Sequence, residues 1–297
     1  MKHLKGAVAL ATILLMGGAM AANAGDMVVS PQWLAAHSAD KDLVLLHVGE
    51  KGEYNANHIP GARYVELSDI SVGRNGLSLE LPDAADLKTR LERLGISDRS
   101  RVVVYYGNDW VSPATRVVFT LYAAGLGDRV SLLDGGMPAW RRAHNATTDK
   151  ATAATTGALS DLHLKPVIVD NAFVNTHAKT PGYVLMDARA PVYYDGVQPG
   201  GAMLHHRKGH IPGARNLPFT NLTHDDLTLK SEAELKAMFQ TAGVGPADHV
   251  IVYCHIGQQA TAILFAAREA GIDAVLYDGS FEDWSIRDLP VELPKGK

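Results

Sequence analysis

The sequence is poor in cysteine and has no excess of basic residues. Among its 297 residues there is one cysteine, Cys254, which excludes an intrachain disulfide and any zinc or iron–sulfur site built from several cysteines. Lysine and arginine total 28 against 32 aspartates and glutamates, and the net charge of −4 argues against a nucleic-acid-binding surface. With 46% hydrophobic and 20% charged residues, the composition is that of a folded globular protein, and its length is typical of two domains.

The first residues predict a secretion signal. Lys2 and Lys5 precede an apolar stretch over residues 7–20, and small residues at 22–24 suit a signal peptidase. We therefore expect residues 1–24 to be a signal peptide and the mature protein to be periplasmic or secreted. The apolar stretch is too short for a membrane span, so no membrane association is expected after cleavage. An unpaired cysteine is unusual in an oxidising compartment, which points to a chemical role for the thiol.

The rest of the chain is a tandem duplication. The sequence HIPGAR occurs at residues 58–63 and again at 210–215, and VVVYY at 102–106 is matched by VIVYC at 250–254. Further segments recur in the same order, and the second copy carries an insertion around residues 198–208. This duplication predicts a first domain over residues 25–144, a linker rich in alanine and threonine over 145–161, and a second domain over 162–297.

Within each copy, short β-branched runs such as residues 102–106 and 250–253 alternate with helical stretches. Alternating strands and helices are typical of the α/β class, in which each domain has a parallel sheet flanked by helices on both faces. We predict helices over residues 232–242 and 261–270, the second ended by Gly271, and helix N-caps at Ser30 and Asp170.

The chemistry of the sequence concentrates at Cys254, which follows a buried strand and precedes a short loop and a helix. Open α/β sheets place their sites at this end of a strand. A loop that turns into a helix N-terminus directs backbone N–H groups inward, where they stabilise negative charge. We therefore expect a lowered thiol pKa and a nucleophilic thiolate, although a free cysteine can also be a small buried apolar residue.

Several motifs together carry a resemblance to a known family. They are the duplicated HIPGA, the sequence DAR at 187–189, the six-residue loop opened by Cys254, and DG at 278–279 followed by Trp284. In combination they resemble the tandem rhodaneses, which are thiosulfate sulfurtransferases with 3-mercaptopyruvate sulfurtransferase as a sibling. The resemblance covers nearly the whole mature chain and implies two rhodanese-like domains.

The resemblance also implies a double-displacement cycle without a metal or an organic cofactor. Cys254 takes sulfane sulfur from a small-molecule donor as a persulfide, and cyanide or a thiol acceptor removes it. Arg189 holds the anionic donor and Asp187 orients Arg189 or the loop, although the two can also be an ordinary ion pair. The implied substrate-binding loop residues are His255, Ile256, Gly257, Gln258 and Gln259. The oligomeric state stays open.

Only the second domain, residues 162–297, is expected to be catalytic. In the first domain, residues 25–144, Tyr106 occupies the cysteine position, and His47 and Gly49 stand where Asp187 and Arg189 stand. The first domain is therefore expected to be inactive and to shape the cleft.

The loop departs from the pattern of both donor classes. Thiosulfate-preferring members carry arginine and lysine after the cysteine and mercaptopyruvate-preferring members carry glycine and serine, whereas this chain has His255 and Ile256. His255 either supplies positive charge when protonated or is exposed without a role. Tyr193 occupies the place of a second arginine that would bind a carboxylate, although Arg207 and Lys208 in the insertion can fold back to replace that charge.

Other interpretations of the same residues are weaker. His205, His206 and His210 suggest a metal cluster, but His210 belongs to the duplicated motif, and its counterpart His58 has no neighbouring histidines. A Cdc25-like phosphatase needs an arginine six residues after the cysteine, where this chain has Ala260. A non-catalytic sulfur carrier or thiol redox sensor would need only the reactive cysteine, and turnover from donor to acceptor separates this possibility from an enzyme.

Overall fold

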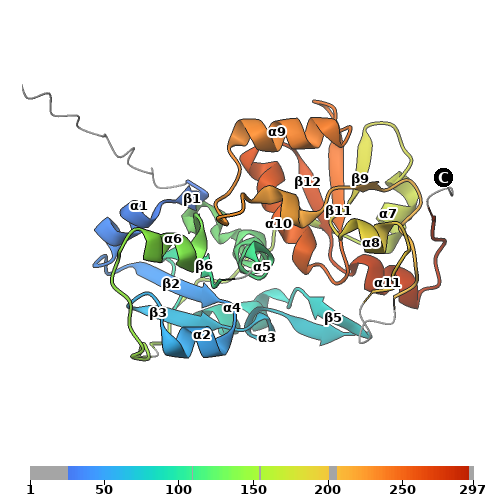
Figure 1. Cartoon of the computed structure of the whole chain (residues 1–297). Coiled ribbons are helices and arrows are strands. Elements are labelled where there is room, and N and C mark those ends of the chain that lie inside the picture. Colours follow the sequence, from blue (N-terminus) through green and yellow to red (C-terminus); the bar gives the residue numbers. More distant parts are fainter. Residues whose placement is uncertain (1–25, 109, 154, 201–205, 294–297) are drawn as a thin grey trace, which may run out of the picture.

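The computed structural model describes residues 26–108, 110–153, 155–200 and 206–293. These residues form two halves, each around its own five-stranded sheet, and the first half of the chain lies beside the second (Figure 1). The expected signal peptide, residues 1–24, lies outside the described residues.

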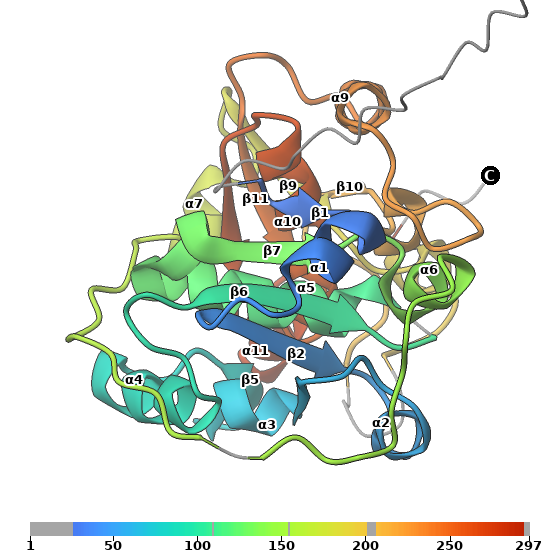
Figure 2. The ribbon, with the colours of Figure 1, turned by 90° about the vertical axis from the view of Figure 1, so that its left-hand side faces the viewer.

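The first sheet has the strand order β1-β7-β6-β2-β3, and all its neighbouring strands are parallel. Figure 2 shows β7, β6 and β2 side by side in this sheet. Its strands are β1 (Val28–Val29), β2 (Leu43–Val48), β3 (Ala62–Val65), β6 (Arg101–Tyr106) and β7 (Val130–Leu133). The helical elements of this half are α1 (Pro31–His37), α2 (Lys51–Ala56), α3 (Leu67–Ile70), α4 (Ala84–Arg93), α5 (Val111–Leu121), η1 (Tyr122–Leu126), η2 (Gly127–Arg129) and α6 (Gly136–Arg142).

The second sheet repeats this arrangement with the order β10-β9-β11-β12-β8, again parallel throughout. Its strands are β8 (Ile168–Val169), β9 (Tyr183–Asp187), β10 (Arg215–Asn216), β11 (His249–Tyr253) and β12 (Ala274–Tyr277). The helical elements of this half are α7 (Asn171–His177), α8 (Pro191–Tyr194), η3 (Phe219–Leu222), α9 (Glu232–Thr241), α10 (Gln258–Glu269) and α11 (Ser280–Ile286). Two duplicated parallel sheets confirm the predicted α/β class.

Helices cover both faces of each sheet, as predicted. Because side chains alternate along a strand, Val252 and Cys254 face a core shared with α9 and α10, whereas Ile251 and Tyr253 face a second core under α7 and α11. The covering helices supply, for example, Phe239 of α9 to the first core. Cys254, the residue after β11, therefore lies on the same side of the sheet as Val252, the side that is turned toward the other half of the protein.

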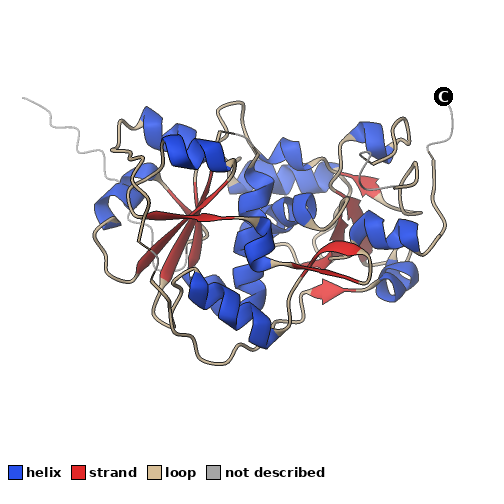
Figure 3. Ribbon diagram, turned by 90° about the horizontal axis from the view of Figure 1, so that it is seen from below, coloured by secondary structure: helices blue, strands red, loops and turns tan. Residues whose placement is uncertain are grey.

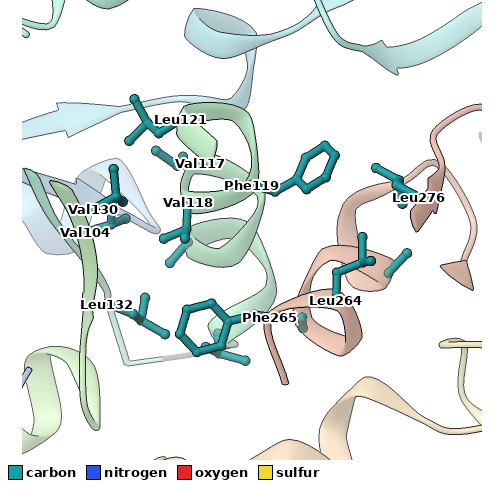
Figure 4. Close-up of a cluster of buried hydrophobic side chains, with 14 of the residues drawn as sticks. Val104, Val117, Val118, Phe119, Leu121, Val130, Leu132, Leu264, Phe265 and Leu276 are labelled. Atoms are coloured by element: carbon teal, nitrogen blue, oxygen red, sulfur yellow. The ribbon is translucent and has the colours of Figure 1, made fainter. Parts of the chain in front are cut away.

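The two halves share one hydrophobic core, which runs through α5 and α10. Figure 3 shows helices lying between the two sheets, and Figure 4 shows Phe119 of α5 and Leu264 and Phe265 of α10 between the strands of both halves. Thr115 and Thr261 also contact each other through their hydroxyls, 3.1 Å apart. Burial of this common apolar surface keeps the two sheets in one fixed relation, which matters for the site that lies at their contact.

A two-stranded antiparallel hairpin, which the alternation of strands and helices did not predict, connects the halves a second time. It consists of β4 (Val72–Arg74) and β5 (Leu77–Glu80) and extends toward α11 (Figure 1). Ser78 donates to the carboxylate of Glu282 from its backbone N–H over 2.7 Å and from its hydroxyl over 2.6 Å. A segment of the first half thereby holds the first turn of α11, next to the Cys254 loop.

The predicted helix signals are confirmed, with one correction. The side chains of Ser30 and Asp170 cap α1 and α7, and Gly271 takes a positive φ of 68° after α10. However, α10 begins at Gln258, three residues before the predicted start at residue 261. No capping side chain marks this end, because the residue at the N-cap position is Gly257.

The duplicated HIPGAR motif is structural in both copies. His58 stacks on Tyr54 with ring centroids 3.9 Å apart, and His210 stacks on Tyr194 at 3.8 Å. Each imidazole also bonds the backbone carbonyl of its stacking partner through Nδ1, over 2.7 and 2.8 Å. These histidines therefore fix the chain where it enters a strand, and neither belongs to the Cys254 loop.

Candidate active site

The loop after β11 surrounds the side chain of Cys254 with backbone amides. The N–H groups of Ile256, Gly257, Gln259 and Ala260 hydrogen-bond toward its sulfur, and each of these bonds lowers the thiol pKa. They belong to the loop and to the first turn of α10, whose aligned peptide dipoles add positive potential at the same point. This cradle is the arrangement expected from the sequence.

The expected lowering of the thiol pKa is nevertheless wrong for this closed form of the site. Cys254 has no solvent-exposed surface, and burial raises the pKa of its thiol by more than the four amides lower it. Desolvation acts on the whole thiolate charge, whereas each N–H group compensates only a part of it. The thiol is therefore protonated while it is fully buried, and the amides can favour the thiolate only when water also reaches the sulfur.

The loop is fastened to the start of α11. The Cys254 N–H donates to Ser280 Oγ over 3.1 Å, and the Phe281 N–H donates back to the Cys254 carbonyl over 3.0 Å. Gly257 has a φ of 81°, and a Cβ at this position would lie 2.7 Å from the carbonyl oxygen of Asp278. Only glycine fits both the left-handed backbone and this close approach.

Asp187 and Arg189 form a buried ion pair beside the loop. The Arg189 Nε and Nη2 atoms donate to the Asp187 carboxylate, with Nη2 2.6 Å from Oδ2, and neither side chain is exposed. Burial disfavours the guanidinium charge, but Asp187 outweighs this and raises the pKa of Arg189, with a further contribution from Cys254. Asp187 thus orients Arg189, and the fixed positive charge lies within electrostatic reach of the sulfur.

His255 is buried and neutral, which excludes both roles considered from the sequence. Its exposed fraction is 8%, and burial, followed by the charges of Arg189 and His206, lowers its pKa to about 3. The ring therefore supplies no positive charge at neutral pH. Tyr193 packs on it edge to face, with ring centroids 4.7 Å apart.

The insertion of the second copy reaches this site through a residue that the sequence did not single out for it. His206 is buried, and its Nδ1 lies 3.2 Å from Nδ1 of His255. Arg207, which could have replaced the missing positive charge, pairs instead with Asp288 at 2.9 Å and donates to the Leu289 carbonyl, and Lys208 is exposed. From the sequence, His206 was interpreted only as a possible metal ligand. Its contact with His255 could not be predicted, because the two residues are far apart along the chain.

A second residue that the sequence missed comes from the first half of the chain. Arg116 of α5 is fully buried and pairs with Asp278, with Nη1 2.5 Å from Oδ1. The same Nη1 donates to the Gly257 carbonyl over 3.2 Å, so a side chain of the first domain supports the loop of the second. No linear motif surrounds Arg116, and its counterpart in α10, Ala262, carries no charge.

The predicted absence of a metal site can be examined only for the described part of the chain. No group of three or more histidine, cysteine, aspartate or glutamate side chains there is placed to hold a metal ion. His210 is engaged with Tyr194, and His205 lies outside the described residues.

Comparison with protein families accounts for both halves. The model of the rhodanese-like domain matches residues 30–143 and again residues 171–287. The chain belongs to the rhodanese family. It is 30% identical to 3-mercaptopyruvate sulfurtransferase of Escherichia coli, over 90% of this chain and 98% of that protein. It is 29% identical to thiosulfate sulfurtransferase of Rattus norvegicus, over 82% of this chain and 83% of that protein.

A solved structure gives the same result for the tandem rhodanese fold. SseA from Escherichia coli, described as a 3-mercaptopyruvate sulfotransferase, superimposes with a TM-score of 0.75 at 27% identity. The match covers 86% of this chain and 98% of SseA. Both rhodanese domains are thus present and arranged as in that relative.

The first rhodanese domain lacks the features of the second. Tyr106 occupies the position of Cys254, lies in the core and donates its hydroxyl to the Leu227 carbonyl over 2.6 Å. His47, in the place of Asp187, is buried, and burial lowers its pKa to about 4. With Gly49 in the place of Arg189, this domain has neither a nucleophile nor a cation at the corresponding point.

Proposed function

We propose that this sulfurtransferase moves the sulfane sulfur of thiosulfate, or of a related thiol donor, to cyanide or a thiol acceptor through a persulfide on Cys254. The observation that carries this proposal is the cradle of four backbone N–H groups around the one thiol of the chain. Such a cradle stabilises a thiolate and, after transfer, the negative charge of a persulfide. Asp187 and Arg189 add an oriented cation for an anionic donor.

In the first half-reaction the Cys254 thiolate attacks the outer sulfur of thiosulfate. A sulfur–sulfur bond forms on Cys254 while the bond within thiosulfate breaks, and sulfite leaves with the bonding electron pair. In the second half-reaction cyanide attacks the terminal sulfur of the persulfide, thiocyanate leaves, and the thiolate is restored. The thiol proton is lost to solvent before the first attack, which requires the closed loop to admit the donor and water.

The phosphatase alternative has no support in the site. Ala260, where an oxyanion-binding arginine would be needed, is fully buried in the core. Arg268, the next arginine along α10, lies over the ring of Tyr122, with its guanidinium carbon 3.6 Å from the centroid. The loop therefore has no arginine at the position that a phosphatase needs.

We expect a higher kcat/KM for thiosulfate than for mercaptopyruvate. Tyr193 packs on His255 where a second, carboxylate-binding arginine is expected, and Arg207 is engaged with Asp288, so the carboxylate of mercaptopyruvate lacks a second cationic partner besides Arg189. Loss of a charge-assisted hydrogen bond lowers specificity about tenfold to a hundredfold. Steady-state kinetics of both donors with cyanide measures this and tests the transfer itself. A preference for mercaptopyruvate would contradict the donor assignment, and no thiocyanate from either donor would contradict the proposed enzyme.

We further propose that the protein is exported and acts in the periplasm or outside the cell. Support comes from Lys2 and Lys5, the apolar stretch and the small residues at 22–24. In the part of the chain that the structure describes, no helix has the length and apolar character to cross a membrane. We expect N-terminal sequencing of protein from a periplasmic fraction to begin at Gly25. Protein found only in the cytoplasm with residue 1 or 2 at its start would exclude export.

A further inference from the structure

Several buried polar atoms at or beside the catalytic loop lack a partner, and two of them belong to Arg189 and His206. Nη1 of Arg189 and Nε2 of His206 make no hydrogen bond to any described residue, and the two side chains are 0% and 4% exposed. Both groups lie against the ring of Phe281, with the Arg189 guanidinium carbon 4.0 Å and the His206 ring 5.9 Å from its centroid. Unsatisfied buried donors are costly, so a pair of them beside a nucleophile indicates a place for a ligand.

The other atoms of both groups are held in place. Arg189 uses Nε and Nη2 on Asp187 and also donates from Nη2 to the Gly209 carbonyl over 2.8 Å. His206 is held by His255 through Nδ1 and packs against the backbone of Gly200, where a Cβ would lie 2.6 Å from its Nδ1. Neither group can turn toward a different partner without losing these contacts.

The contact between the two imidazoles determines whether Nε2 of His206 carries a proton and can donate a hydrogen bond. Two Nδ1 atoms 3.2 Å apart form a hydrogen bond only if one carries a proton and the other does not. When His255 donates, the neutral His206 ring carries its proton on Nε2. An anion beside Arg189 stabilises this tautomer, because it accepts the Nε2–H bond and offsets the positive charge that faces the ring.

We propose that His206 binds the anionic group of the sulfur donor through Nε2–H, together with Nη1 of Arg189, and that the insertion thereby supplies a donor-binding residue. This inference rests on the proposed sulfur transfer. The ligand is a small sulfur compound with an oxyanion, such as thiosulfate. His255 is a positioning residue, since it reaches the donor only through His206.

Because of the charges around His206, the proposal predicts that the affinity for thiosulfate depends on pH. The titratable groups that act on it are Arg189, which is paired with Asp187, and the neutral His255. Burial, followed by the charge of Arg189, lowers the pKa of His206 to about 4. A bound dianion offsets these effects and raises that pKa, so binding takes up a proton. Affinity therefore increases as the pH falls from 8 to 5, a range in which thiosulfate keeps its charge.

The test measures equilibrium binding of thiosulfate by calorimetry in the Cys254→Ala protein, which cannot react. We expect His206→Phe to weaken binding about tenfold to a hundredfold and to remove its pH dependence, because one hydrogen bond to an anion is lost. In His206→Gln the side-chain amide keeps an N–H donor near the position of Nε2, so we expect most of the affinity without the pH dependence. Arg207→Ala is the matched control in the same insertion, and its binding should not change.

The outcomes separate this inference from the proposed function. If His206→Phe binds thiosulfate as tightly as its parent while the protein that keeps Cys254 still turns thiosulfate over, the role of His206 is overturned. The proposed function is then unaffected. Absence of turnover would overturn the proposed function, whereas binding that depends on His206 and pH would still support the anion site. If His206→Phe fails to fold, His206→Gln with an unchanged pH dependence overturns the inference.

Discussion

Replacement of Cys254 by serine is expected to abolish sulfur transfer. The serine hydroxyl has nearly the size of the thiol but is not ionised at neutral pH, and it cannot hold sulfur as a persulfide. Because Cys254 is the only cysteine, no other thiol of the chain can replace it. Intact-mass measurement after incubation with thiosulfate should show one added sulfur in the wild type, its removal by cyanide, and no added sulfur in Cys254→Ser.

The control for Cys254→Ser is a test of whether the variant still folds. Thermal unfolding of Cys254→Ser should resemble that of the wild type, since the backbone N–H at this position still donates to Ser280. Turnover near the wild-type rate in Cys254→Ser would disprove the persulfide mechanism. A wild-type protein that gains sulfur but does not pass it to cyanide or a thiol would instead be a carrier.

Replacement of Arg116 by alanine is expected to give the largest loss of stability. Arg116 and Asp278 are 0% and 3% exposed, so the substitution leaves a buried carboxylate without its partner. We expect the free energy of unfolding to fall by about 3–5 kcal/mol, measured by urea denaturation. The Gly257 carbonyl also loses its donor, so kcat/KM should decrease as well.

A matched control is available in the same contact between the domains. Arg142 pairs with Asp226 at 3.3 Å, but both side chains are about half exposed. Arg142→Ala should therefore cost no more than about 1 kcal/mol. The double variant Arg116→Met, Asp278→Asn removes the isolated charge and should recover part of the loss. Equal effects of Arg116→Ala and Arg142→Ala would show that burial of the Arg116 pair does not matter.

The helix N-terminal signals could be interpreted without coordinates because their interactions are local. The side chain of Ser30, for example, accepts a hydrogen bond from the Trp33 N–H in the first turn of the helix that directly follows it. The start of α10 was placed too late, since Gly257 is selected by its closeness to Asp278 rather than by a capping side chain. Sequence patterns report such distant contacts only weakly.

The sequence by itself determined the duplicated α/β fold and the position of Cys254 at the end of a central strand. These follow from periodicity, repetition and short spacing, which act within one element or one turn. Only the tertiary structure decided that His206 meets His255, that Arg116 of the first domain holds Gly257 of the second, and that burial raises the pKa of the Cys254 thiol. The reason is physical: desolvation and contacts between distant segments depend on how the two sheets pack on their shared core, and that packing is a property of the whole chain.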